Sequence, residues 1–185
     1  TRTAELDPPG ALAIGSIAGF GEDGCGELYI CDLGGEIFKI VPAAPVTTGL
    51  APYGTGTAGC SGTHVLSAST PAAIHAPCWT LTTTNAPASS VGILALADVQ
   101  DLAGSDPLGV GLTLHVSLGS PLLMLFPVPS NASGTGTLTI PIPNSTALIG
   151  ATLYGQTAWG WPAGPCAPSA IGASSSNGLG ITIQG

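Results

Sequence analysis

The sequence predicts an all-β protein: a β-sandwich, immunoglobulin-like or jelly-roll-like, preceded by an N-terminal β-hairpin arm. Apolar and polar residues alternate in several segments, which is the pattern of a strand with one buried face. Turn-forming Gly, Pro and Asn separate these segments at short intervals, as in known sandwiches. A helix is an alternative only in residues 91–101, and the β-branched start of that segment weakens it.

Residues 1–45 are predicted to form the arm. Two short β-prone runs, residues 28–32 and 36–41, flank the pair Gly34-Gly35, and this arrangement indicates a hairpin. A third short apolar run precedes them at residues 14–20. Residues 46–59 are rich in Pro, Gly, Thr and Ala without periodicity, so we interpret them as a linker.

Residues 60–185 are predicted to form the sandwich. The clearest strand is residues 110–118, where His115 lies on the polar face and the opposite face carries Val110, Leu112, Leu114, Val116 and Leu118. Residues 138–142 repeat the pattern, and Pro141 indicates an edge or a bulge there. Residues 79–84, 91–99, 151–159 and 179–184 complete the set, with 91–99 as a central strand.

Charge is scarce and unevenly placed. Charged residues make up 6% of the chain, against roughly 25% in an average soluble domain. Both cations and seven of the ten acids precede residue 43, so the rest of the chain holds only Asp98, Asp101 and Asp106. The net charge of -8 argues against binding to nucleic acid or to anionic membranes. The longest apolar runs are too short to span a bilayer.

The chain has five cysteines, without a CxxC pair or a histidine at metal-ligand spacing. Disulfides in an oxidising compartment suit this composition better than a zinc site does. Our expected pairs are Cys25–Cys31 and Cys60–Cys78, which leave Cys166 unpaired or bonded to another chain. Spacing does not fix this connectivity. We therefore expect an extracellular or cell-surface location, and a chain beginning at Thr1 is expected to be processed or a fragment.

Residues 17–41 carry a pattern of Phe-Gly-Glu-Asp, Gly-Glu-Leu-Tyr, Gly-Gly and a final Ile-Phe-Lys-Ile-Val. This stretch resembles the closing blade of secreted β-propellers of the glucose/sorbosone dehydrogenase-like family. The remainder resembles the Gly/Leu/Thr-rich C-terminal β domains of secreted proteins of planctomycetes and related bacteria. The family's cofactor and substrate residues would lie on blades that this chain lacks, so the resemblance transfers no catalytic residue.

The candidate sites each have a structural alternative. Three histidines and many serines are present, but a Gly-x-Ser-x-Gly motif is not, so we predict no catalytic residues and no cofactor. Asp98, Asp101 and Asp106 are a weak Ca²⁺ candidate, and solvated loops are the favoured interpretation. Trp159, Trp161 and Tyr154 fit a sugar-binding platform, although core packing is favoured. Asn131 and Asn144 lie in glycosylation sequons.

A detached hairpin is marginally stable, and its edges offer unpaired backbone groups to another sheet. We therefore predict a non-catalytic, secreted structural subunit that polymerises into an extracellular filament by strand donation, with itself and glycans as partners. The predicted assembly residues are Leu28, Tyr29, Ile30, Ile37, Phe38 and Ile40. The alternatives are a C-terminal sorting or attachment fragment of a propeller enzyme, and a carbohydrate-binding module.

Overall fold

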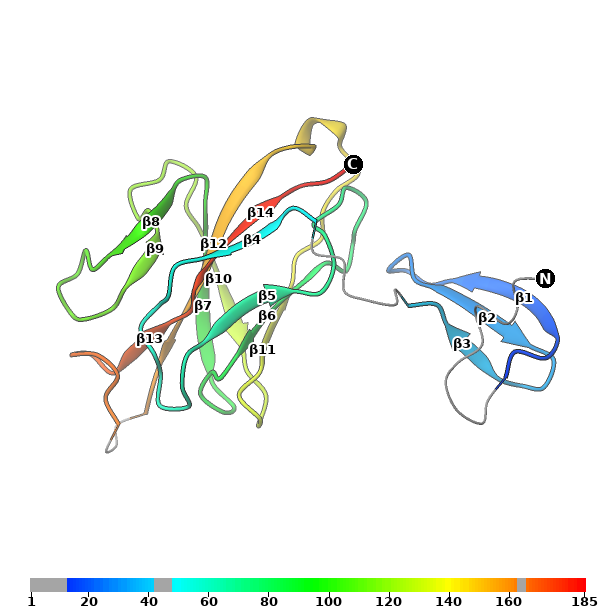
Figure 1. The fold of residues 1–185 in the computed structure, drawn as a ribbon, viewed down its shortest axis with the longest axis horizontal. Helices are drawn as coiled ribbons and strands as arrows, with labels where there is room; N and C mark the ends of the chain where they lie inside the picture. Colours follow the sequence, from blue (N-terminus) through cyan, green and yellow to red (C-terminus); the bar gives the residue numbers. More distant parts are fainter. Residues whose placement is uncertain (1–12, 42–47, 163–165) are drawn as a thin grey trace. The chain divides into compact units, whose positions relative to one another are not determined.

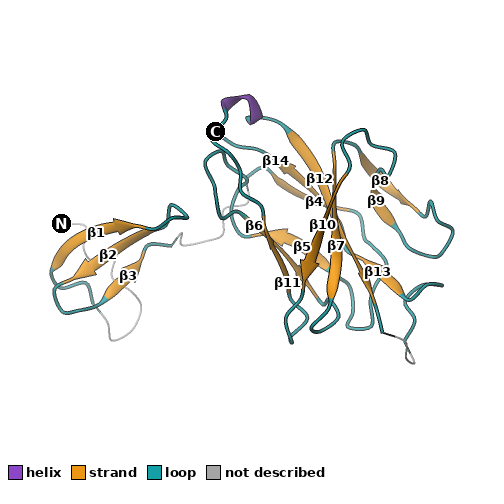
Figure 2. Ribbon diagram, turned by 180° about the vertical axis from the view of Figure 1, so that it is seen from behind, coloured by secondary structure: helices purple, strands orange, loops and turns teal. Residues whose placement is uncertain are grey.

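The computed structural model describes residues 13–41, 48–162 and 166–185, and strands dominate it (Figure 1). Within these residues the one helical element is a short 3-10 turn, η1 (Thr146–Leu148), so the all-β prediction is confirmed (Figure 2). The chain divides into two compact units, Thr1–Pro45 and Val46–Gly185. We call the first unit the arm and the second the sandwich.

The arm is a three-stranded antiparallel sheet in the order β1-β2-β3. Its strands are β1 (Ile17–Glu22), β2 (Leu28–Asp32) and β3 (Ile37–Lys39). Gly35 has a φ of 103° in the turn between β2 and β3, a conformation that favours glycine. The predicted hairpin is present as β2 and β3, and β1 extends it by one strand on the other side of β2.

The larger sheet of the sandwich has the order β10-β7-β12-β14-β4, with β13 beside β12. Its members are β4 (Leu50–Tyr53), β7 (Val91–Ala97), β10 (Met124–Pro129), β12 (Thr152–Gly160), β13 (Ala173–Ser175) and β14 (Gly178–Thr182). The predicted central strand in residues 91–99 is confirmed, because β7 pairs with both β10 and β12.

The second sheet has the order β11-β6-β5 and consists of β5 (Val65–Ala68), β6 (Thr80–Thr84) and β11 (Gly136–Thr139). A separate ribbon joins β8 (Gln100–Ser105) to β9 (Leu114–Val116). The ribbon is attached to the larger sheet by polar contacts, since the hydroxyl of Tyr53 donates to the His115 carbonyl at 2.8 Å.

The core lies between the two sheets of the sandwich. Leu94 and Trp159 of the larger sheet and Leu66 and Leu81 of the smaller one belong to a single buried cluster. Alternation along these strands places the four side chains inward, with apolar neighbours such as Ile93 on the outer face. A buried hydroxyl pair, Thr83 and Thr157, also links the sheets with 3.1 Å between the two oxygens.

Two predictions of organisation were wrong. The proposed linker of residues 46–59 contains β4, which pairs with β14 and closes one edge of the larger sheet, so the sandwich does not begin at residue 60. The strand proposed for residues 110–118 is limited to Leu114–Val116. Gly109 and Gly111 have φ values of 65° and 80°, which interrupt an extended strand before it reaches Leu114.

Candidate functional site

The arm exposes large apolar side chains that a small sheet cannot bury. Phe20 on β1 and Ile37 on β3 are 67% and 69% exposed, and Leu33 and Val41 are exposed as well. In its described part, residues 13–41, only Ile14 and Ile30 are buried apolar residues. The arm therefore presents contact surface in place of a core of its own.

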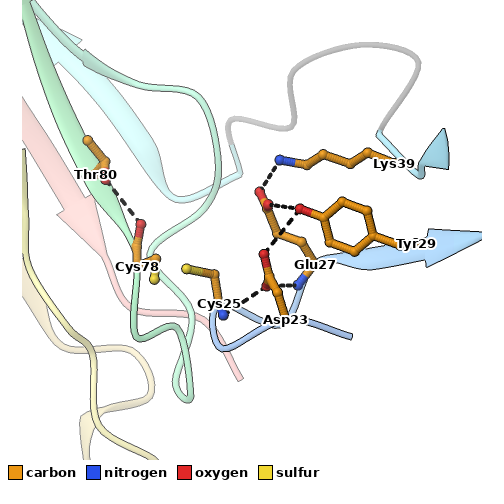
Figure 3. A network of polar contacts seen from close by, with 7 residues as sticks. All are labelled: Asp23, Cys25, Glu27, Tyr29, Lys39, Cys78 and Thr80. Carbon is orange, nitrogen blue, oxygen red and sulfur yellow. Dashed lines mark hydrogen bonds and ion pairs between the residues drawn. The ribbon is translucent and has the colours of Figure 1, made fainter. Parts of the chain in front are cut away.

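A polar network fixes one end of the arm (Figure 3). The carboxylate of Asp23 accepts the N–H groups of Cys25 and Glu27 at 2.9 and 3.0 Å and the hydroxyl of Tyr29 at 3.1 Å. These bonds, chiefly the one from the Glu27 N–H, hold the pKa of Asp23 below its ordinary value. Glu27 also forms an ion pair with Lys39 of β3. The network thus ties the turn after β1 to β2 and β3.

The arm residues predicted to mediate assembly fall into two groups. Leu28, Tyr29 and Ile30 belong to β2, whose two edges are occupied by β1 and β3, so these residues have no backbone edge to donate. Ile37 and Phe38 belong to β3, which is an edge strand, and Ile40 follows it. Strand donation by β2 is therefore excluded within the arm, and the part that these residues play in assembly stays a prediction.

The cysteine pairing differs from the prediction. Cys60 is bonded to Cys166, 106 positions later in the sequence, so neither Cys60–Cys78 nor an unpaired Cys166 is correct. Cys31 is the free cysteine of the described residues, so Cys25–Cys31 is also wrong. The presence of disulfides is confirmed, whereas proximity along the chain misled the pairing.

The three acids of the weak calcium candidate serve separate loops. Asp98 accepts the hydroxyl of Ser120, and Asp101 accepts the Gly104 N–H at 3.0 Å. Asp106 accepts the N–H groups of Gly111 and Val110 at 2.6 and 3.2 Å, and these bonds lower its pKa, the Gly111 bond most. Among the described residues, no group of three or more His, Cys, Asp or Glu could hold a metal ion. Asp101 and Asp106 each stabilise a local turn, and Asp98 connects its loop to Ser120, which lies 22 positions later.

A serine–histidine pair does occur inside the sandwich. His64 Nε2 lies 2.6 Å from Ser174 Oγ, and the indole N–H of Trp161 donates to the same oxygen at 2.6 Å. His64 Nδ1 lies 3.3 Å from the Thr84 carbonyl, which can only accept, so we assign the proton to Nδ1. Ser174 then donates to Nε2 while it accepts from Trp161. His64 and Ser174 are both 0% exposed, so the pair is closed to a substrate.

His115 is buried, contrary to its predicted place on a polar face. Its ring nitrogens lie 3.1 Å from the carbonyls of Asp101 and Thr55, and its backbone N–H donates to Gln156 at 2.7 Å. The side chain therefore connects three segments of the sandwich. The period-two pattern missed this role because the ribbon turns both faces of β9 inward, with all three residues buried.

The proposed aromatic platform is not formed. Trp159 is 1% exposed and packs in the core, and its indole N–H has no hydrogen-bond partner among the described residues. Trp161 is partly exposed, with its ring anchored by Ser174, and Tyr154 is partly buried and packs edge-on against Tyr53. The core interpretation thus holds for Trp159, and a single accessible tryptophan remains.

Both sequon asparagines are exposed and lie outside the strands. Asn131 follows β10, where its side-chain oxygen accepts the N–H groups of Ser133 and Thr135 at 3.0 and 2.9 Å. Asn144 lies between β11 and η1. Exposure in a turn is what a glycosylation site requires.

No family model, curated protein or solved structure matches the chain. In the part of the chain that the structure describes, no helix has the length and hydropathy needed to cross a membrane. The features of the chain that bear on function are therefore the arm, the strand edges and the disulfides.

Proposed function

We propose that the chain is a non-catalytic secreted structural subunit that assembles with copies of itself into an extracellular filament. The observation that carries the proposal is the arm: a three-stranded sheet with several large apolar side chains exposed, Phe20 and Ile37 among them. Exposed apolar residues gathered on so small a unit are typical of an interaction surface.

The sandwich supports this role through its lack of charge. Its formal charges are the three aspartates, and each accepts hydrogen bonds from groups within the sandwich. Neutral surfaces of this kind repel one another little when many copies stack closely. Glycans at Asn131 and Asn144 would supply solubility to the remaining surface.

Secretion is supported by the cysteines. The Cys60–Cys166 disulfide joins two exposed residues, and such bonds persist in oxidising compartments. An extracellular filament also needs subunits that resist unfolding without chaperones, and a covalent link across most of the sandwich contributes to this resistance.

Association of the purified chain tests the proposal. We expect sedimentation velocity to show larger species as concentration rises, and electron microscopy to show fibres. Ile37→Ser on the arm should weaken association, because it removes an exposed apolar contact. Ile93→Ser is the matched control on the sandwich, where the side chain is also exposed. Monodisperse monomers at high concentration would contradict self-assembly, and an effect of Ile93→Ser without one of Ile37→Ser would contradict the role of the arm.

A further inference from the structure

We propose that two copies of the chain pair backbone to backbone through β3 of their arms, and that the strand edges of the sandwich take no part in this pairing. The inference rests on the proposed function, because it names the strand edge through which self-assembly occurs. The edge strands differ in whether they direct backbone N–H groups outward, where another strand could pair with them.

The larger sheet ends in two strands whose prolines face outward. On β10, the Ser130 N–H donates to the Ser90 carbonyl at 2.8 Å. Successive residues of an antiparallel strand direct their backbone groups to opposite sides, so the nitrogens of Pro127 and Pro129 face away from β7. On β4, the Gly49 carbonyl accepts the Thr182 N–H at 2.8 Å, which places Pro52 outward in the same way. Proline has no N–H to donate, so both edges are poor templates for another strand.

The other sandwich edges are protected to different extents. At β5, the amide of Asn177 accepts the Leu66 N–H at 2.8 Å and donates to the Leu66 carbonyl at 3.3 Å, in the place of a neighbouring strand. At β11, Gly136 is bridged to Ser130 and Pro141 lies at the outward position beyond the strand, whereas Thr137 and Thr139 direct their backbone groups outward. The register of β8 shifts between Gln100 and Ser105, and such an irregularity disrupts pairing.

In the arm, β3 is a regular edge without these protections. The Ile40 N–H donates to the Leu28 carbonyl at 2.9 Å, so Phe38 and Ile40 face β2 while Ile37 and Lys39 direct their backbone groups outward. The other edge strand, β1, has a register shift between Ile17 and Gly19 and is less suited to continuous pairing. Of the edges described, β3 combines outward backbone groups with the exposed apolar side chain of Ile37, whereas the open positions of β11 are two threonines.

A second copy of β3 fits this edge. In an antiparallel pair centred on Phe38, Ile37 lies opposite Lys39 of the other copy, and both residues can exchange N–H and carbonyl groups. The same register places Glu36 opposite Ile40, so no charge faces a like charge. Lys39 is already paired with Glu27 within its own arm, which offsets its cost at an interface. Pairing would join two three-stranded sheets into one.

The experiment compares two proline substitutions at outward-facing N–H groups. Ile37→Pro removes the donor from β3, and Leu125→Pro removes one from β10, whose edge already carries prolines; these side chains are 69% and 59% exposed. Neither change removes a bond to the neighbouring strand. We expect Ile37→Pro to weaken the association constant by about tenfold or more, since a symmetric pair loses both donors, and Leu125→Pro to leave it unchanged.

Hydrogen exchange of the unsubstituted chain provides a second measurement. As concentration rises, the amides of Ile37 and Lys39 should gain protection while that of Leu125 should not. Association that persists in Ile37→Pro, or protection that appears on β10 and not on β3, would overturn β3 pairing but leave self-assembly standing. A chain that remains monomeric would overturn both proposals, so the two failures are distinguishable.

Discussion

At the scale of single residues, His64 is a polar group held in its neutral form. Its ring is fully buried, and its two nitrogens face a carbonyl and the Ser174 hydroxyl in a way that needs only one proton. Burial lowers the pKa of His64 from its ordinary value of 6.5, although the bond to the Thr84 carbonyl opposes this shift. The folded chain therefore resists protonation at this position more than the unfolded chain does.

This difference predicts a loss of stability on acidification. Above pH 6.5 the ring is neutral in both states and contributes no pH dependence. As the pH falls below that value, the His64 ring is protonated in the unfolded chain but stays neutral in the folded chain. The free energy of unfolding therefore decreases. Urea unfolding at a series of pH values should show this slope, and His64→Gln should remove it.

His75, which is exposed, provides the control, because His75→Gln should keep the slope. The aspartates whose pKa values are lowered, Asp23, Asp32 and Asp106, lose their contribution in a separate window, as the pH falls below about their ordinary value of 3.8. A slope between pH 6.5 and 5 that survives in His64→Gln would show that another group titrates there.

At the scale of elements, glycines on the inner faces of strands leave space for Trp159. A Cβ on Gly92 of β7 would lie 2.5 Å from the indole ring, and one on Gly136 of β11 would lie 2.7 Å from it. These contacts are shorter than van der Waals distance. The buried tryptophan of β12 thus depends on small residues from both sheets, a dependence that no pattern within one strand indicates.

Gly92→Ala should therefore destabilise the sandwich by about 1–3 kcal/mol, because the ring or the strands must shift to admit a methyl group. Gly160→Ala, at the end of β12, has open space around its Cβ position and should change stability by at most about 0.5 kcal/mol. Midpoints of chemical unfolding for the two variants give the comparison. Equal midpoints would mean that Trp159 is not held in a fixed position.

At the scale of the whole molecule, one disulfide joins the start of the sandwich to its last third. Cys60 and Cys166 are 106 positions apart, so the bond removes a large amount of freedom from the unfolded chain. This link matters for a fold made of long-range strand pairs, since residues as distant as Leu66 and Asn177 must meet at one edge.

Replacing both partners, Cys60→Ala with Cys166→Ala, should lower the free energy of unfolding by about 2–5 kcal/mol. Cys31→Ala is the control, since that thiol is free and its loss opens no loop. Mass spectrometry checks the pairing itself: iodoacetamide added to the chain in urea without reductant should label Cys31 alone. Label on Cys166 would contradict the assignment.

Much of the fold could be predicted because strand patterns are local. The nearly continuous apolar run of residues 91–99 sufficed for β7, whereas β4 was missed, since its four residues include Pro52 and lack a clear pattern. The candidate site was predicted only in part. The apolar run of the arm indicated an interaction surface, but the assignment of β3 as edge and β2 as centre required the pairing of β1.

The sequence by itself determined the class of structure: strands throughout, disulfides, a charge-bearing arm and a nearly uncharged sandwich. These properties follow from composition and from short periodic segments. The tertiary structure alone decided the Cys60–Cys166 bond, the burial of His64, His115 and Trp159, and the means by which each strand edge is closed. Each of these features depends on which distant segments become neighbours. The backbone groups that face outward at a strand edge are determined by the register of its pairing with the neighbouring strand.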